Sequence, residues 1–289
     1  MSATGPPTPQ DDDQVAFGFP EEWVDFKKRS PAFHRIVPAL SETIQKVFGR
    51  SETLRGTADK VIFNLGNVCA EDFLEIFLLC ANGYGIGGMK LLRGLYERAV
   101  TVGYLVNQPS EAEAFLAYGD VHRGKQLNHA RKVFDMASLL KAELIREIDE
   151  GYQAAKPKFQ ETLCEKCGTT RDMGSWTKLS TEALAHKANP PGTKKGIEQL
   201  YLPCYFDPTM QVHATVFSLI SRFDPTKEDI SFDTGPQRAK ADLTMMSAHN
   251  VLLAVMEMQN RHFKLGMDDE IEARRQDFIS AWTKAPSGP

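Results

Sequence analysis

The sequence predicts an all-α protein, an irregular helical bundle in a single domain behind a disordered N-terminal tail. Apolar residues recur at spacings of three and four through most of the chain, which is the pattern of one face of a helix. No alternating apolar and polar run lies between tight hairpin turns, and neither a βαβ rhythm nor an internal repeat is present. The chain has 289 residues, 42% of them hydrophobic, which is enough to bury a large core without disulfides.

The helical domain is expected to span residues 19–284. Residues 1–18 hold several prolines, three consecutive aspartates and little apolar sequence, so we expect a disordered tail. Residues 285–289 are expected to form a loose C-terminus.

The first half of the domain contains the most regular apolar patterns. A helix is expected to begin at Pro31, because proline is tolerated in a first turn, and to end at Gly49. A second apolar run, residues 71–81, meets the glycine cluster at residues 83–88. This cluster either breaks the helix or lets another helix pack closely. Helical sequence then continues over residues 89–105.

The second half alternates helices with loops. Residues 110–156 predict one or two long helices, and residues 180–187 predict a short helix that Ser180 caps. Helical sequence resumes near Ile197, breaks at residues 207–208 and resumes again. The other expected elements are loops at residues 158–179 and 222–236 and helices at residues 237–263 and 268–282.

Charge and terminal sequence restrict the class of protein. The net charge of −4 argues against a nucleic-acid-binding protein that depends on a large basic field, but it leaves a local basic groove open. The first residues lack the basic start and apolar core of a signal peptide, and no apolar run reaches the roughly 18 residues that span a bilayer. We therefore expect a cytoplasmic protein with no membrane partner. The odd number of cysteines, five, indicates free thiols in such a protein.

Arg93 and Glu97 are the first candidate site residues. They lie four residues apart, so they share one face of a helix whose other residues are strongly apolar. The structural interpretation is an ion pair that fixes helix packing. A buried ion pair is costly to desolvate, so it usually needs further polar partners. His213 is the candidate partner, because the residues three, four and seven positions after it are apolar and place it on the core side. It is either a satisfied core histidine or a general base in a pocket.

Cys164 and Cys167 form a Cys-x-x-Cys pair in a predicted loop. Two thiolates at this spacing can share one zinc ion. A second pair is missing, so Cys204, His186 or His213 would have to complete the site. The sequence therefore predicts no cofactor, with zinc as the alternative and plain loop cysteines as the simpler interpretation.

Arg123 and His129 have a spacing similar to that of the helical HEPN ribonucleases, in which an arginine and a histidine act on the RNA phosphate and the 2′-hydroxyl. A second pair, Arg29 and His34, also falls within that family's range of four to six intervening residues, as chance alone would give in this composition. Gly124 stands where that family prefers a polar residue.

A longer resemblance involves several short segments between residues 60 and 222. They are Leu91–Glu97, Tyr104-Leu105, Trp176, residues 180–185, Tyr201, Tyr205 and His213. In this order they resemble a bacterial helical family of unknown function, family 5677. The resemblance implies an all-α fold and makes Arg93, Glu97, Tyr205 and His213 a joint polar centre. The family's serine shortly before the histidine is replaced near Pro208-Thr209.

Two functions fit these observations. The first is a non-enzymatic interaction or regulatory module, in a bacterial stress or phage-defence setting, which predicts a buried, fully satisfied Arg93/Glu97/His213 network. The alternative is a metal-independent nuclease or nucleotide-acting enzyme that uses a buried Arg/Glu/His centre, with RNA or a nucleotide as its partner. It predicts a cleft in which an arginine and a histidine converge. The sequence leaves the protein partner and a homo-oligomer open.

Overall fold

The computed structural model describes residues 18–51, 53–133, 140–190, 196–220, 222–223 and 232–282. These residues form an irregular bundle of helices with one two-stranded sheet, so the all-α prediction is confirmed. The predicted disordered tail, apart from Gly18, and the predicted loose C-terminus lie outside the described residues.

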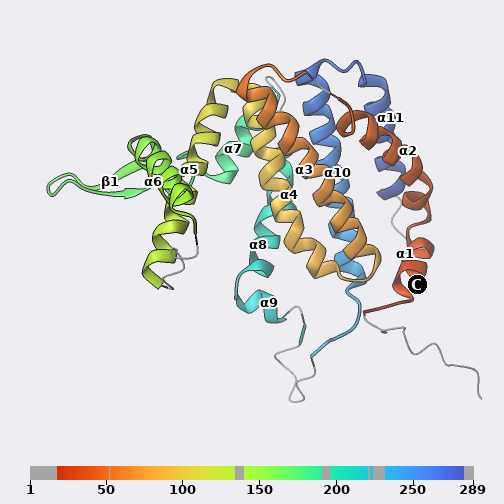
Figure 1. Ribbon diagram of the computed structural model, residues 1–289. Helices are drawn as coiled ribbons and strands as arrows, with labels where there is room; N and C mark the ends of the chain where they lie inside the picture. The colour runs from red at the N-terminus through yellow and green to blue at the C-terminus, as the bar shows by residue number, and fades with distance from the viewer. Residues whose placement is uncertain are drawn as a thin grey trace, which may run out of the picture.

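Three long helices lie side by side at the centre of the bundle (Figure 1). They are α3 (Gly56–Ala81), α4 (Gly85–Asn107) and α10 (Arg238–Phe263), and each packs against the other two. Helix α10 is buried around most of its circumference, as Met245, Leu252 and Met256 show, which is typical of a helix inside a core. The helix predicted at residues 237–263 is confirmed.

The glycine cluster between α3 and α4 has both of its expected effects. Gly83 follows the end of α3 and has a φ of +83°, a left-handed conformation that glycine adopts without strain. A Cβ atom on Gly85 would collide with backbone atoms of Gln237 and Ala241 at the start of α10. The missing side chain therefore lets the first turn of α4 approach α10 closely.

Three helices pack along one side of the central layer (Figure 1). They are α1 (Glu22–Arg29), α2 (Pro31–Phe48) and α11 (Asp268–Trp282). The start of α2 at Pro31 and the bounds of α11 agree with the sequence prediction. Trp282, the last residue of α11, donates through Nε1 to Nδ1 of the buried His249 at 3.1 Å, which ties the end of the domain to the core.

Several short elements cover the other side of α4. They are α7 (Thr181–Ala188), the 3₁₀-helix η4 (Ile197–Leu200), the π-helix η5 (Leu202–Phe206), α8 (Asp207–Val212) and α9 (Val216–Ile220). The Ser180 hydroxyl accepts from the Ala183 N–H at 3.1 Å, so the predicted cap is confirmed. The break predicted at residues 207–208 is wrong. The π-helix η5 runs directly into α8, which has Pro208 near its start, and the helical backbone ends at Val212.

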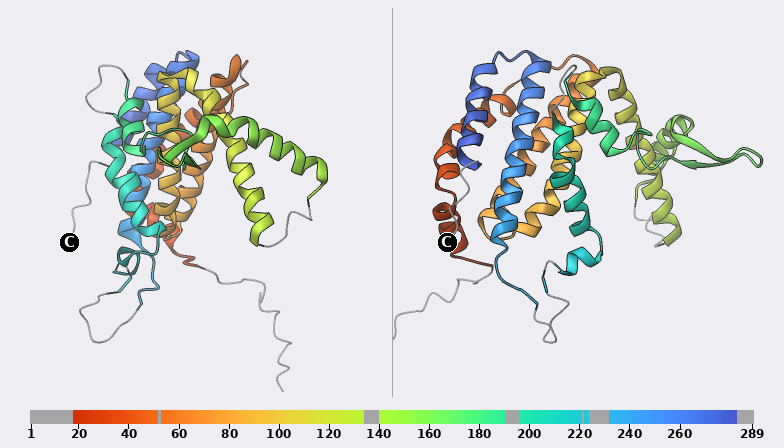
Figure 2. Two further views of the ribbon diagram at one scale, coloured as in Figure 1. Left: turned by 90° about the vertical axis from the view of Figure 1, so that its left-hand side faces the viewer. Right: turned by 180° about the vertical axis from the view of Figure 1, so that it is seen from behind.

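The remaining elements form an arm that projects from the bundle (Figures 1 and 2). They are η1 (Pro109–Glu111), α5 (Ala112–Val133), α6 (Ala142–Ala155), η3 (Lys156–Phe159), β1 (Gln160–Cys164) and β2 (Thr169–Asp172). The arm has its own small core, formed by Tyr118, Val121, Tyr152, Ala155, Phe159 and Met173, which Trp176 connects to the main core.

The loop predicted at residues 158–179 is wrong in part, because it contains the antiparallel pair β1–β2. Residues of β1 are half-buried or exposed on both faces. The hairpin therefore lacks the apolar–polar alternation from which a strand is predicted. Within the described ranges, each helix is too short or too polar to cross a membrane.

Candidate functional site

Arg93 and Glu97 lie on the same face of α4, as their spacing predicts. Oε1 of Glu97 accepts from Nε of Arg93 at 3.3 Å and from Nη2 at 3.2 Å. The side chain of Arg93 is 22% exposed and that of Glu97 is 41% exposed. Both groups are therefore open to solvent and belong to the surface of the bundle.

His213 and Tyr205 reach this pair from the segment that covers α4. Nη1 of Arg93 lies 3.2 Å from Nε2 of His213, and the guanidinium carbon lies 5.1 Å from the centre of the Tyr205 ring. A guanidinium has only donors, so Nε2 must accept in this contact and the neutral imidazole carries its proton on Nδ1. The structure thus brings together all four residues of the predicted polar centre, from positions up to 120 residues apart.

The π-helix η5 fixes the position of Tyr205. Its wider turn buries Cys204 while Tyr205 faces α4, and the Thr209 hydroxyl donates to the Tyr205 carbonyl at 2.6 Å. Tyr201 lies 5.1 Å from Tyr205, ring centre to ring centre, and both rings pack near Tyr96. π-Turns occur often at functional sites because they redirect one side chain within a helix.

Tyr96 holds this covering segment against α4. Its buried hydroxyl donates to the Ile197 carbonyl at 3.0 Å. Burial raises the pKa of Tyr96 well above its usual value, so the phenol stays a neutral donor. Burial, together with the neighbouring Tyr205, also raises the pKa of Tyr201.

The prediction that this centre is buried is wrong. His213 is exposed, and Val216, Phe217 and Ile220, which were expected to face the core, are 62%, 53% and 41% exposed. The helix ends at His213, whose ψ of 156° is extended, and α9 has only five residues. The apolar spacing after His213 therefore lies on a separate short helix and does not extend the buried face of α8.

A hollow of about 590 Å³ lies beyond Tyr201, next to the tyrosine rings. His186 and Glu198 line it, and Nδ1 of His186 lies 2.7 Å from Oε2 of Glu198. This histidine–carboxylate contact could not be predicted from sequence, because the two residues belong to separate short elements that only tertiary packing brings together. Glu97 itself lines a smaller hollow of about 190 Å³ on the other side of the centre.

Cys164 and Cys167 lie at the turn of the β1–β2 hairpin and do not join the residues expected to complete a zinc site. Cys204 is buried in the bundle, and His186 and His213 contact Glu198 and Arg93. No cluster of three metal-ligating side chains occurs in the part of the chain that the structure describes. The described residues therefore do not complete a zinc site around Cys164 and Cys167.

Arg123 and His129 lie on α5, in the projecting arm. The guanidinium of Arg123 is held by two carboxylates, Asp120 at 2.6 Å and Glu147 at 3.2 Å. These contacts raise its pKa further and fix the arm helices to each other. Arg123 of the HEPN-like pair therefore joins α5 to α6.

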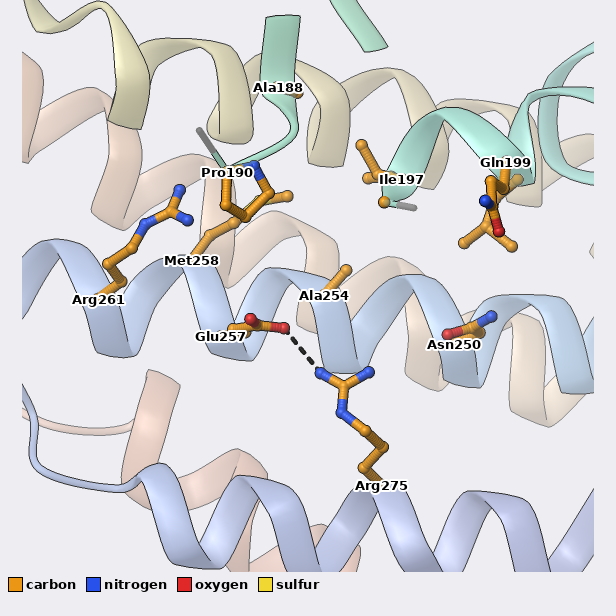
Figure 3. Close-up of a pocket in the computed structure, with 12 residues that line it drawn as sticks. Ala188, Pro190, Ile197, Gln199, Asn250, Ala254, Glu257, Met258, Arg261 and Arg275 are labelled. Carbon is orange, nitrogen blue, oxygen red and sulfur yellow. Dashed lines mark hydrogen bonds and ion pairs between the residues drawn. The ribbon is translucent and has the colours of Figure 1, made fainter. Parts of the chain in front are cut away.

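Another cavity, of about 280 Å³, lies between α10, α11 and η4 (Figure 3). Its cationic side chains already have partners: Arg275 bonds Glu257 at 2.7 Å and Arg261 bonds Asn107 at 3.2 Å. The residues that line it include none of the predicted site residues. We therefore place the candidate site at Arg93.

The fold and this site define an all-α protein with an arginine-centred polar cluster at its surface. The chain belongs to a family of unknown function, DUF5677, whose sequence pattern matches residues 59–231. The resemblance expected over about residues 60–222 is thereby confirmed. No curated protein and no solved structure matches the chain.

Proposed function

We propose that the chain is a metal-independent enzyme that cleaves RNA at the Arg93 cluster. The observation that supports this most is the hydrogen bonding of the Arg93 guanidinium. A guanidinium has five N–H donors, of which Glu97 takes two and His213 takes one. One N–H on each of Nη1 and Nη2 has no partner among the described residues. Two such donors in one plane suit an oxyanion such as a phosphodiester.

Each residue of the cluster then has a chemical role. Nε2 of His213 accepts the proton of the ribose 2′-hydroxyl once the exposed imidazole turns away from Arg93. The 2′-oxygen attacks phosphorus, the bond to the 5′-oxygen breaks, and the leaving oxygen takes a proton from water. Arg93 neutralises charge on the phosphoryl oxygens, and Glu97 and the Tyr205 ring keep the guanidinium in place. The products are a 2′,3′-cyclic phosphate and a 5′-hydroxyl.

Cleavage of a single-stranded RNA in EDTA tests this function. We expect a 2′,3′-cyclic phosphate end and no cleavage of DNA of the same sequence, because DNA lacks the attacking hydroxyl. His213→Ala should abolish cleavage. His186→Ala is the matched control, since it also removes an exposed histidine, but one that contacts Glu198 and lies outside the Arg93 cluster. Cleavage that persists in purified His213→Ala, or none by the unaltered chain, would refute the proposal.

The second candidate is the interaction or regulatory module, which the exposed apolar side chains after Tyr205 favour. Large apolar residues of η5, α8 and α9 are 41–62% exposed. They are Leu202, Phe206, Val212, Val216, Phe217, Leu219 and Ile220. Asp207 is the one Asp, Glu, Lys or Arg in residues 202–220, so two copies of this surface would meet with little charge repulsion.

We propose a second copy of the chain as the partner in that case. Sedimentation over a range of concentrations should show a dimer, and Phe217→Asp should convert it to a monomer. A monomer at all concentrations would argue against this candidate. A cytoplasmic location, a bacterial origin and a role in stress or phage defence stay predictions for either function.

A further inference from the structure

The hairpin turn of the arm places two thiols side by side. Strand β1 ends at Cys164 and pairs it with Thr169, the first residue of β2, after an irregularity in register at Thr162. Gly168 turns the chain back with a φ of +66°. Both thiols of the Cys-x-x-Cys pair therefore belong to one turn whose two ends are held by paired strands.

The turn leaves its thiols accessible to an ion. Cys167 is exposed, and its sulfur lies 2.9 Å from the Thr169 hydroxyl. Cys164 is half-buried at the end of β1. Both thiols therefore lie at the tip of the hairpin and within reach of an ion in solvent.

The other three cysteines lack this access. Cys69, Cys80 and Cys204 are buried in the bundle. Burial raises the pKa of Cys80 and of Cys204 to about 12, and it raises that of Cys69 further. These thiols stay protonated and enclosed by the core, so they cannot supply ligands to an ion at the hairpin.

The arm presents the turn away from the bundle. Figure 2 shows the hairpin extending beyond α5 and α6. Its base is fixed, because the Tyr152 hydroxyl donates to Asp172 at 2.7 Å and Arg171 bonds Glu161 at 2.7 Å across the strands. At the tip, a Cβ on Gly168 would meet nothing within 4 Å. A second hairpin can therefore approach the two thiols from outside.

We propose that Cys164 and Cys167 are half of a zinc site that a second copy of the chain completes. A structural zinc ion takes four ligands in a tetrahedron, and two of these turns supply four thiolates around a two-fold axis through the metal. The part of the chain that the structure describes offers no third ligand in such a cluster, so one copy leaves the ion half coordinated. Four thiols lose four protons as the ion binds, and no electron is transferred.

Native mass spectrometry of the full chain, purified with zinc and a reductant, tests this proposal. We expect a dimer that holds one zinc ion per two chains and that separates into metal-free monomers when a chelator is added. Cobalt in place of zinc should give the visible spectrum of a tetrahedral thiolate complex. Cys167→Ser should bind no metal and stay monomeric. Lys166→Ala, which alters the same turn but keeps both thiols, should behave as the unaltered chain.

Three results would overturn the proposal. One is a zinc ion bound by a single chain. Another is a dimer that persists in Cys167→Ser and in chelator. The third is a disulfide between Cys164 and Cys167, seen as the loss of two hydrogens per chain under the same reducing conditions. None of these results bears on RNA cleavage, because the hairpin is separate from the Arg93 cluster.

Discussion

Two arginine–glutamate pairs in this protein have the same chemistry but different surroundings. The Glu22 side chain is 4% exposed and accepts from Arg238 through Nε at 2.9 Å and through Nη2. Arg29 donates to its second oxygen at 3.5 Å. The Glu97 side chain is 41% exposed, and its carboxylate accepts from Arg93 alone among the described residues.

The difference shows what each pair does. Around Glu22 the donors saturate a buried carboxylate and join α1 to the start of α10, so the pair is part of the fold. Around Arg93 the carboxylate orients the guanidinium, and two guanidinium N–H groups have no partner among the described residues. An exposed pair contributes little to stability, roughly 0–1 kcal/mol, so its arrangement is better explained by binding.

Arg93→Lys should lower activity strongly and leave the fold intact. Lysine keeps the charge but loses the planar pair of donors, so we expect RNA cleavage to fall by about 100-fold or more. The free energy of unfolding should change by less than about 1 kcal/mol. Arg98→Lys is the matched control, because Arg98 is bonded to Asp72 at 2.7 Å on the same helix. Equal cleavage by the two variants would contradict the role of Arg93.

Glu22→Gln should lower the stability of the protein and leave its activity unchanged. The amide is nearly the same size, but it replaces a buried charged acceptor by a group that also donates. We therefore expect the free energy of unfolding to fall by about 2 kcal/mol, measured by urea denaturation. RNA cleavage per folded molecule should be unchanged. If Glu97→Gln lowered the free energy of unfolding as much as Glu22→Gln, the exposed pair would contribute to the fold as much as the buried pair does.

The buried His249 makes the stability of the protein depend on pH. Burial lowers the pKa of His249 to about 3, while the unfolded chain binds that proton near 6.5. The unfolded state therefore binds more protons between these values, so stability is full above pH 6.5 and falls as pH drops towards 3. The slope from one such group is at most about 1.4 kcal/mol per pH unit.

Urea denaturation across this pH range measures the slope. His249→Asn should flatten it, since asparagine does not titrate and can still accept from Trp282. A slope that is the same in His249→Asn and in the unaltered chain would show that His249 does not control acid stability.

The helices could be predicted from sequence to a large extent, because their signals are local. Apolar spacing predicted α10 and α11 almost to the residue, and Ser180 predicted a cap that the structure contains. The hairpin could not be predicted, since neither face of β1 is buried and no alternation results. The π-helix η5 was missed for a related reason: its wider turn has no signal in residue spacing.

The fold class, the helix that places Arg93 beside Glu97, and the family follow from apolar spacing and short motifs. Helix packing brings His213 and Tyr205 to Arg93, leaves this centre at the surface, and buries Cys204 while Cys167 is exposed at the hairpin. A spacing of four residues fixes neighbours within one helix, whereas a contact across 120 residues depends on how whole helices pack and where each one ends.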